Sequence, residues 1–162
     1  MSAQLADTLE RGADELGVAL THAQVTTLLE FVALLERWNR AYNLTAVRDP
    51  LQMVSRHLLD SLSIMRFICG KTLLDVGSGA GLPGLVLAIA MPKLEVTLLD
   101  PALKRTRFLA HASRELGLAN VTVERARKLA QPRTGPLQRR LWGLWSCRCV
   151  PKADSVFNMR AV

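Results

Sequence analysis

The spacing of apolar residues predicts helices in the first part of the chain. Residues 3–16 fit a short amphipathic helix that ends near Gly17. A second helix begins after Thr21, which can form a capping box with Gln24. Apolar residues then recur at helical spacing, so the aromatic side chain at position 38 is expected to pack in the core rather than bind a ligand. This stripe consists of Val25, Leu28, Leu29, Val32, Leu35 and Trp38.

A third helix is predicted to start at Asp49, with this residue as the N-cap and Pro50 at the first helical position. The helix carries Arg56 and His57 side by side. A single histidine on such a helix is usually a structural hydrogen-bonding residue. Because an arginine lies beside it, a contact with RNA is the alternative.

From residue 71 onward, apolar strands alternate with helical segments. Strands are predicted at 71–76, 95–99 and 121–124, and helices at about 82–91 and about 102–116. Three strands joined by two helices indicate a parallel α/β sheet with right-handed crossovers. The second of these helices carries three clustered basic residues, which form either a solvated face or a phosphate contact. They are Lys104, Arg105 and Arg107.

The turn after the first strand is rich in glycine. Asp75 closes the strand, and Gly77, Gly79 and Gly81 follow at alternate positions. Glycine accepts positive φ angles and lets a ligand approach the backbone closely. Asp100 ends the next strand, nineteen residues after Gly81. This layout is typical of a βαβ nucleoside site, in which the acid accepts hydrogen bonds from ribose hydroxyls.

Two nucleoside cofactors fit this turn. Residues 79–84 match the dinucleotide pattern G-x-G-x-x-G, which indicates NAD. However, the first glycine after the strand is Gly77, and Asp75 lies just before it, which favours the S-adenosylmethionine turn of class I methyltransferases. A tight turn without any ligand is the third interpretation. It is disfavoured because glycine weakens a structure that does not need it.

Composition limits the class of protein. The 162 residues are 49% hydrophobic and 22% charged, which predicts a folded domain with a sizeable core, or a small domain with part of a second. The chain contains neither an apolar run of membrane-spanning length nor a secretory signal. Three cysteines without a C-x-x-C pair predict free thiols in the cytoplasm and no metal site.

The net charge of +7 is unevenly distributed. Residues 1–124 hold 12 Lys and Arg against 13 Asp and Glu, whereas residues 125–162 hold 9 basic residues against Asp154 alone. A basic tail attracts nucleic acid irrespective of its sequence, although it can also be a solvated chain end.

Several motifs together resemble the RsmG family, also called glucose-inhibited division protein B. The resemblance covers roughly residues 15–127 and keeps the order of the motifs. The matching motifs are Trp38-Asn39, Tyr42-Asn43-Leu44-Thr45, Arg48-Asp49-Pro50, Arg56-His57-Leu58-Leu59-Asp60-Ser61, Leu98-Leu99-Asp100 and residues 75–84 and 104–109.

The resemblance implies a 16S rRNA methyltransferase that uses S-adenosylmethionine to methylate N7 of one guanosine, with 16S rRNA or the small ribosomal subunit as partner. It implies a class I methyltransferase (Rossmann-like) α/β sheet behind a helical N-terminal segment. N7 carries a lone pair and no proton, so no general base is needed and no catalytic residue is singled out. The implied cofactor-binding residues are Asp75, Gly77, Ser78, Gly79, Gly81, Leu82 and Asp100, and the expected RNA-binding residues are Arg56, Lys104, Arg105 and Arg127.

The family pattern stops after Arg127, where Lys128 and Leu129 follow and no further strand can be identified. Trp142 and Trp145 lie among arginines and could stack on bases, or this stretch could be sequence never selected to fold. The predicted division is therefore a helical segment at 1–68, the first half of a methyltransferase domain at 69–127 and an atypical basic tail at 128–162. Such a chain would be a truncated or altered-frame product, and the alternative function is an inactive fragment that at most binds RNA.

Overall fold

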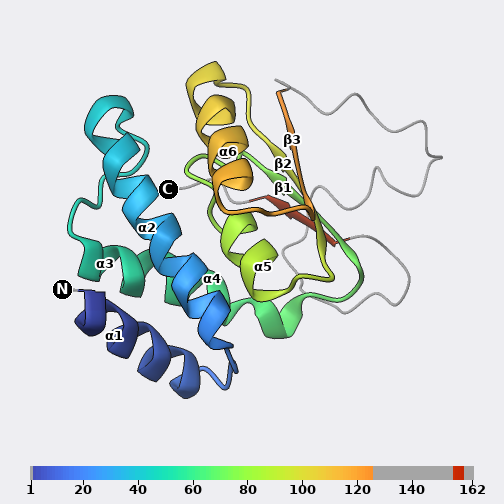
Figure 1. Ribbon diagram of the computed structural model, residues 1–162. Helices are drawn as coiled ribbons and strands as arrows, with labels where there is room; N and C mark the ends of the chain where they lie inside the picture. Colours follow the sequence, from blue (N-terminus) through green and yellow to red (C-terminus); the bar gives the residue numbers. More distant parts are fainter. Residues whose placement is uncertain (1, 126–154, 159–162) are drawn as a thin grey trace.

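The computed structural model describes residues 2–125 and 155–158 and arranges them in three layers (Figure 1). Helices of the N-terminal part form the first layer, and α2 contacts both α5 and α6 in the second. These two helices in turn pack on the strands of the sheet. The first layer consists of α1 (Ser2–Glu15), α2 (His22–Tyr42), α3 (Pro50–Met53), the π-helix η1 (Val54–Leu59), α4 (Asp60–Ser63) and the 3-10 helix η2 (Met65–Phe67).

The start of α2 is the predicted capping box. The Gln24 amide donates to Oγ1 of Thr21 over 3.3 Å, and the Thr21 amide donates to Oε1 of Gln24 over 2.8 Å. The Gln24 side chain also donates through Nε2 to the carbonyls of Ile89 and Ala90, at 3.3 and 2.9 Å. The same residue therefore caps α2 and satisfies carbonyls at the end of α5, which ties the helical layer to the helix that follows the glycine turn.

The third predicted helix begins as expected but is not regular. Asp49 is the N-cap, with its side chain accepting from the Leu51 amide, and Pro50 is the first helical residue. The α-helical pattern gives way to a π-helical stretch over Val54–Leu59, which contains both Arg56 and His57, and then resumes in α4. The local sequence pattern does not predict such a stretch, because π-helical turns are rare and occur mostly as single turns inside α-helices.

The sheet has the strand order β3-β2-β1-β4, and all neighbours are parallel. The three predicted strands are confirmed as β1 (Thr72–Val76), β2 (Glu95–Leu99) and β3 (Val121–Glu124). The expectation of no further strand was wrong, because β4 (Ser155–Asn158) pairs with β1 from Leu73↔Ser155 to Val76↔Asn158. This strand pairs with the free edge of β1, and such pairing with a distant segment cannot be inferred from the local pattern of residues.

Helices α5 (Gly84–Ala90) and α6 (Leu103–Glu115) connect the first three strands. The predicted start of the first helix at residue 82 was two residues too early, because residues 81–83 belong to the turn and Pro83 is the N-cap. Both helices contact the sheet, α5 on β1 and β2 and α6 on β3. The parallel α/β arrangement with its incomplete sheet is thus as predicted.

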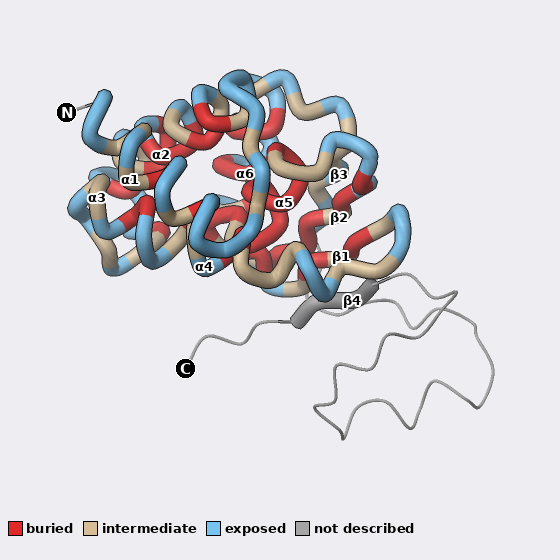
Figure 2. The backbone as a smooth tube through the Cα atoms, turned by 90° about the horizontal axis from the view of Figure 1, so that it is seen from below, coloured by how far each residue is buried: buried red, intermediate tan, exposed pale blue. Residues whose placement is uncertain are grey.

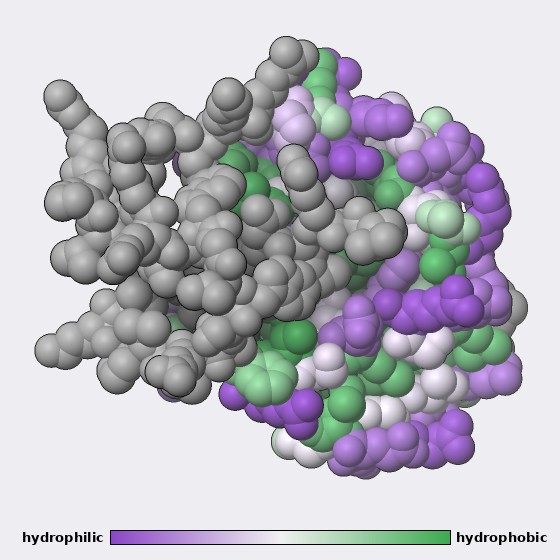
Figure 3. All heavy atoms as spheres, turned by 180° about the vertical axis from the view of Figure 1, so that it is seen from behind, coloured by the Kyte–Doolittle hydropathy of each residue, from purple (hydrophilic) through white to green (hydrophobic). Residues whose placement is uncertain are grey.

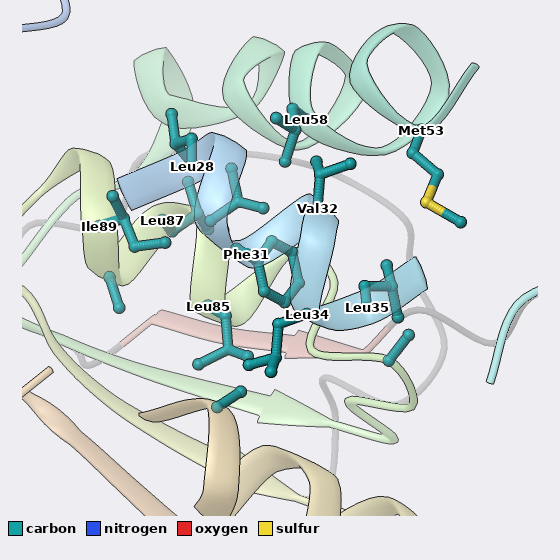
Figure 4. Packing of buried hydrophobic residues seen from close by; sticks show 14 of the residues in the cluster. Leu28, Phe31, Val32, Leu34, Leu35, Met53, Leu58, Leu85, Leu87 and Ile89 are labelled. Carbon is teal, nitrogen blue, oxygen red and sulfur yellow. The ribbon is translucent and has the colours of Figure 1, made fainter. Parts of the chain in front are cut away.

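One hydrophobic core joins the helical layer to the sheet layer. Buried residues lie along the inner sides of α2 and α5 and along β1 and β2 (Figure 2). In Figure 4, Phe31 and Leu34 of α2 point toward Leu85 of α5, while Val32 faces Leu58. Burying each such side chain stabilises the fold by about 1.5–3 kcal/mol. Because these contacts cross between layers, the helical segment and the strands share a single core.

The outer surface carries both hydrophilic and hydrophobic side chains. Seen from behind, hydrophilic side chains form most of the rim of the described part, and hydrophobic residues show as small separate groups (Figure 3). Among the described helices, none is both long and apolar enough to cross a lipid bilayer.

Candidate functional site

The glycine turn leaves β1 with three glycines in a conformation that other residues rarely adopt. The φ angles are +82° at Gly77, +55° at Gly79 and +86° at Gly81. A residue with a Cβ atom loses roughly 1–2 kcal/mol in this region, so the backbone path of the turn depends on glycine. The alternating glycines predicted from the sequence are therefore all used for backbone conformation.

Packing divides the glycines of the turn into two kinds. A Cβ atom on Gly81 would lie 2.5 Å from Cδ1 of Leu85 and 3.1 Å from Cδ2 of Leu109, and one on Gly84 would clash with Leu98 and with the Asp75 carboxylate. A Cβ atom on Gly79 would meet nothing closer than the Gly77 carbonyl at 3.7 Å. The turn is therefore packed against the core at one end and approachable at Gly79.

Asp75 lies beneath the turn. Its side chain is 1% exposed, and its Oδ2 accepts a hydrogen bond from the Gly84 amide over 3.1 Å. Burial raises the pKa of Asp75 from 3.8 to about 7, an effect opposed by the hydrogen bonds from Gly84 and Ser78 and reinforced by the nearby charge of Asp100. The carboxyl group thus fixes the start of α5 against the end of β1.

Ser78 has a structural function that the sequence did not suggest. Its side chain is 1% exposed, with Oγ donating to the Asp75 carbonyl over 2.9 Å and accepting from the Leu99 amide over 3.1 Å. The amides of Gly77 and Ser78 both donate to the Leu99 carbonyl, at 2.7 and 3.2 Å. These bonds join the turn after β1 to the end of β2, and only the paired strands reveal them.

Asp100 lies directly beside the turn, as the spacing predicted for the second acid of the site. Its Oδ2 accepts from the Gly79 amide over 3.1 Å, and its Oδ1 accepts from the Ala102 amide over 2.8 Å. Nη1 of Arg105 lies 3.5 Å from Oδ2, and the carboxylate is 1% exposed. The structure thus brings Asp75, Asp100 and the glycines together at the carboxyl ends of β1 and β2. Leu82 lies in the same turn and is half-buried.

The basic residues expected to bind RNA lie in different surroundings. Arg105 is paired with Asp100, whereas exposed Lys104 donates to the carbonyl of Tyr42 over 3.3 Å. Arg56 is exposed on η1, which packs against α1, and among the described residues it makes no ion pair with the site. Arg127, like Trp142 and Trp145, lies outside the described residues. Arg105 is therefore the basic residue that an ion pair ties to Asp100 beside the turn, whereas Lys104 contacts the end of α2.

A buried asparagine organises the segment that follows α2. Asn39 is 2% exposed; its Oδ1 accepts from the Thr45 amide over 2.9 Å, and its Nδ2 donates to the Val47 carbonyl over 3.2 Å. Oγ1 of Thr45 lies 2.9 Å from Nε2 of His57, which confirms the structural interpretation of this histidine. Burial is the main cause that lowers the pKa of His57.

Two cavities lie away from the turn. One, of about 330 Å³, is lined by the start of α2, the end of α5 and residues 116–120, and the other, of about 320 Å³, lies between α1 and η1. Across the ranges 2–125 and 155–158, no group of three His, Cys, Asp or Glu side chains could hold a metal ion.

Comparison with known proteins gives this geometry a family context. The sequence model of the family described as rRNA small subunit methyltransferase G (GidB) matches residues 24–138. Curated proteins named ribosomal RNA small subunit methyltransferase G are similar to the chain: it is 51% identical to that of Marinomonas sp. (strain MWYL1) over 121 residues and 58% identical to that of Pseudomonas aeruginosa (strain LESB58) over 123 residues. The protein of Chromohalobacter salexigens is 59% identical over 119 residues.

These alignments cover only part of each relative. They include 75%, 75% and 74% of this chain but 58%, 58% and 57% of the three relatives, respectively. The chain therefore spans little more than half the length of the curated relatives that it matches, and the glycine turn and Asp100 fall inside the family match.

Proposed function

This chain belongs to the rRNA small subunit methyltransferase G family, and on this basis we infer that it binds S-adenosylmethionine and presents it to 16S rRNA for methylation of a guanine N7. The observation that carries this proposal is the glycine turn that is hydrogen-bonded to Asp100 at the carboxyl ends of β1 and β2.

The residues at this edge fit the cofactor. A Cβ atom on Gly79 would meet only the Gly77 carbonyl, at 3.7 Å, so the backbone can be approached closely here, as a nucleoside requires. Asp100 is oriented by two backbone amides, and a carboxylate offers about four acceptor positions. Because the residue is 1% exposed, a ribose hydroxyl would reach a remaining position only after a neighbouring side chain such as Arg105 moves aside. Asp75 and Ser78 would act indirectly, because their buried polar atoms hold the turn rather than face outward.

S-adenosylmethionine supplies the electrophilic methyl group when it is bound. Guanine N7 carries a lone pair and no proton, so the protein does not need to remove one. The contribution of the chain would then be orientation, since holding the reacting atoms in line replaces a bimolecular encounter with a unimolecular step. The hydrogen bonds that join Gly77 and Ser78 of the turn to Leu99 of β2 would hold the turn in place for this orientation.

The RNA would be held by basic residues near this edge. Lys104 and Arg105, in the first turns of α6, are proposed phosphate contacts, and Arg56 is a proposed contact on the helical layer. We place the activity in the cytoplasm, where 16S rRNA and the small ribosomal subunit are found.

The chain spans little more than half the length of its relatives. The alternative function is therefore that of an inactive fragment that at most binds RNA. A single preparation separates the two. Binding of S-adenosylmethionine is measured by calorimetry, and transfer is measured with tritiated S-adenosylmethionine and small-subunit RNA that lacks the modification. A full-length relative serves as the positive control.

The variant Gly77→Asp tests whether the turn is responsible, because it places a charged side chain at a φ of +82° in the turn. Gly117→Asp is the matched control, since Gly117 also has a positive φ of +64° and nothing within 4 Å of an added Cβ atom. The proposal is supported if Gly77→Asp alone loses both the binding of S-adenosylmethionine and the transfer of the tritiated methyl group to RNA. A chain that binds RNA but neither binds nor uses the methyl donor supports the fragment instead.

A further inference from the structure

The end of α2 carries an exposed aromatic ring next to two basic side chains. We propose that Tyr42, Arg48 and Lys104, named here the Tyr42 surface, bind single-stranded RNA, with one base stacked on the tyrosine ring. The proposal rests on the function inferred above and adds where and how the RNA substrate is held.

The Tyr42 ring is supported from one side and open on the other. It stacks on Trp38 with 5.1 Å between ring centroids and 26° between planes, and yet the residue is 41% exposed. Trp38 is itself packed against Phe108 and His111, at 5.5 and 5.1 Å between centroids. A ring that is fixed from behind loses little freedom when a base stacks on its outer face.

The charges beside the ring suit phosphate. Lys104 donates to the Tyr42 carbonyl and Arg48 donates to Oδ1 of Asn43, at 3.3 and 3.2 Å, which places both cations around the end of α2. In the part of the chain that the structure describes, neither forms an ion pair with a carboxylate. Asp49 follows Arg48, but its side chain caps the Leu51 amide. The surface thus joins an aromatic face to unpaired positive charge, the combination used for single-stranded nucleic acid.

The surface is also preorganised. The backbone that runs from Tyr42 to Asp49 is held by the buried Asn39, which bonds to both Thr45 and Val47. Asn43 ends α2 in the left-handed region at a φ of +48°. Because the loop is already fixed, binding does not have to order it first.

The position of the surface connects it to the cofactor site. Lys104 is four residues beyond Asp100, and its neighbour Arg105 is paired with that carboxylate. An RNA strand that lies across Tyr42 and Lys104 would therefore run beside the carboxyl ends of the strands, where the glycine turn lies (Figure 1). A stacking platform at this place would position a neighbouring guanine for methylation.

The test uses the full chain and two short fluorescein-labelled RNA strands, one with bases and one abasic, followed by fluorescence anisotropy. Stacking contributes about 1–3 kcal/mol per base, so Tyr42→Ala should weaken binding of the base-bearing strand by about 5- to 150-fold and leave the abasic strand unchanged. Tyr42→Phe should keep most of the affinity. Lys104→Gln and Arg48→Gln should weaken both strands, and each should reduce the slope of log K against log salt by about 0.7.

Phe67→Ala is the matched control. Phe67 is 49% exposed and lies under the Arg66 guanidinium at 4.8 Å, but it precedes β1 and is thus away from the carboxyl edge of the sheet. Its loss should leave RNA affinity unchanged. All variants keep the basic C-terminal segment, so any affinity that it gives for RNA is the same in each. The difference between Tyr42→Ala and Phe67→Ala therefore measures the contribution of the Tyr42 ring.

The proposal is overturned if Tyr42→Ala and Phe67→Ala act alike, if the abasic strand responds equally to Tyr42→Ala, or if the chain binds neither strand. Calorimetry with S-adenosylmethionine on the same samples separates the two hypotheses. A chain that binds the methyl donor while Tyr42→Ala leaves RNA affinity intact refutes the Tyr42 surface alone, whereas failure to bind the donor refutes the proposed function.

Discussion

The Gly79 amide donates a hydrogen bond of 3.1 Å to Oδ2 of Asp100, across a separation of 21 residues. This bond joins the turn after β1 to the residue that ends β2. Asp100 therefore shapes the turn, and the proposed function gives it a second role as a contact of the methyl donor.

Asp100→Asn should weaken binding of S-adenosylmethionine by about tenfold or more. The asparagine side chain presents one oxygen and one amino group to two backbone amides, so a hydrogen bond to a charged acceptor worth about 1.5–3 kcal/mol is lost. Calorimetry with the donor measures the change. Asp7→Asn, on exposed α1, is the control and should not alter binding. Equal affinities for Asp100→Asn and the unmodified chain would contradict the assigned function of Asp100.

Alanine at Gly79 and at Gly81 should have different consequences for stability. Gly81→Ala adds a Cβ atom against Leu85 and Leu109 at a φ of +86°, so the free energy of unfolding should fall by about 2–4 kcal/mol. Gly79→Ala adds only an ordinary contact with the Gly77 carbonyl, at 3.7 Å, and should cost only about 1 kcal/mol. Urea denaturation distinguishes the two.

The binding of S-adenosylmethionine by Gly79→Ala tests whether Gly79 lines the donor site. Gly117→Ala has the same backbone cost in open space far from the turn, and should therefore match Gly79→Ala in stability. Only Gly79→Ala should weaken the binding of S-adenosylmethionine. If both variants bind the donor equally well, Gly79 does not line the site.

The sequence predicted the parts of the fold that depend on local pattern. The capping box of Thr21 and Gln24, the N-cap at Asp49 and the three strands all follow from residues close together in the chain. The placement of Asp100 beside the turn followed as well, because parallel neighbouring strands end at the same edge.

The remaining features depend on contacts that the local sequence pattern does not specify. Ser78 lies among glycines, and nothing in that pattern shows that its hydroxyl joins β1 to the Leu99 amide. Arg105 reads as a solvated or phosphate-binding residue until the fold brings it to Asp100. The strand Ser155–Asn158 exists through pairing with β1, which no local propensity encodes.

Asn39→Ala should loosen the loop that carries the Tyr42 surface. It removes a buried side chain that bonds to two backbone groups. The Thr45 amide and the Val47 carbonyl then lack this partner, which costs about 1–3 kcal/mol for each group that remains buried. Hydrogen exchange at the Thr45 amide should become faster, while exchange in β2 should change only through global stability. Unchanged protection of the Thr45 amide would show that Asn39 does not fix the loop.

The pH dependence of stability should contain a component from His57. Burial lowers its pKa in the folded chain below the ordinary value of 6.5, so the stabilising contribution is present above that value and is lost as pH falls through the folded pKa. His57→Gln should flatten this acid limb, and denaturation from about pH 7 to about pH 5 measures it. His22→Gln, on an exposed residue, is the control. An acid limb that is equally steep in His57→Gln would exclude the assignment.

Asp75 should act in the opposite direction. Its pKa is raised from 3.8 in the unfolded chain to about 7 in the folded one, so the unfolded state alone loses its proton between these values. The contribution of Asp75 to stability is therefore fully present below about pH 4 and declines as pH rises, by about 4 kcal/mol at most once pH exceeds about 7. Asp75→Asn does not ionise, so its stability relative to the unmodified chain should improve steadily over this range. Urea denaturation at several pH values gives the difference between Asp75→Asn and the unmodified chain. A constant difference between Asp75→Asn and the unmodified chain across the range would mean that the buried carboxyl group stays ionised, and that the Gly84 and Ser78 hydrogen bonds outweigh its desolvation.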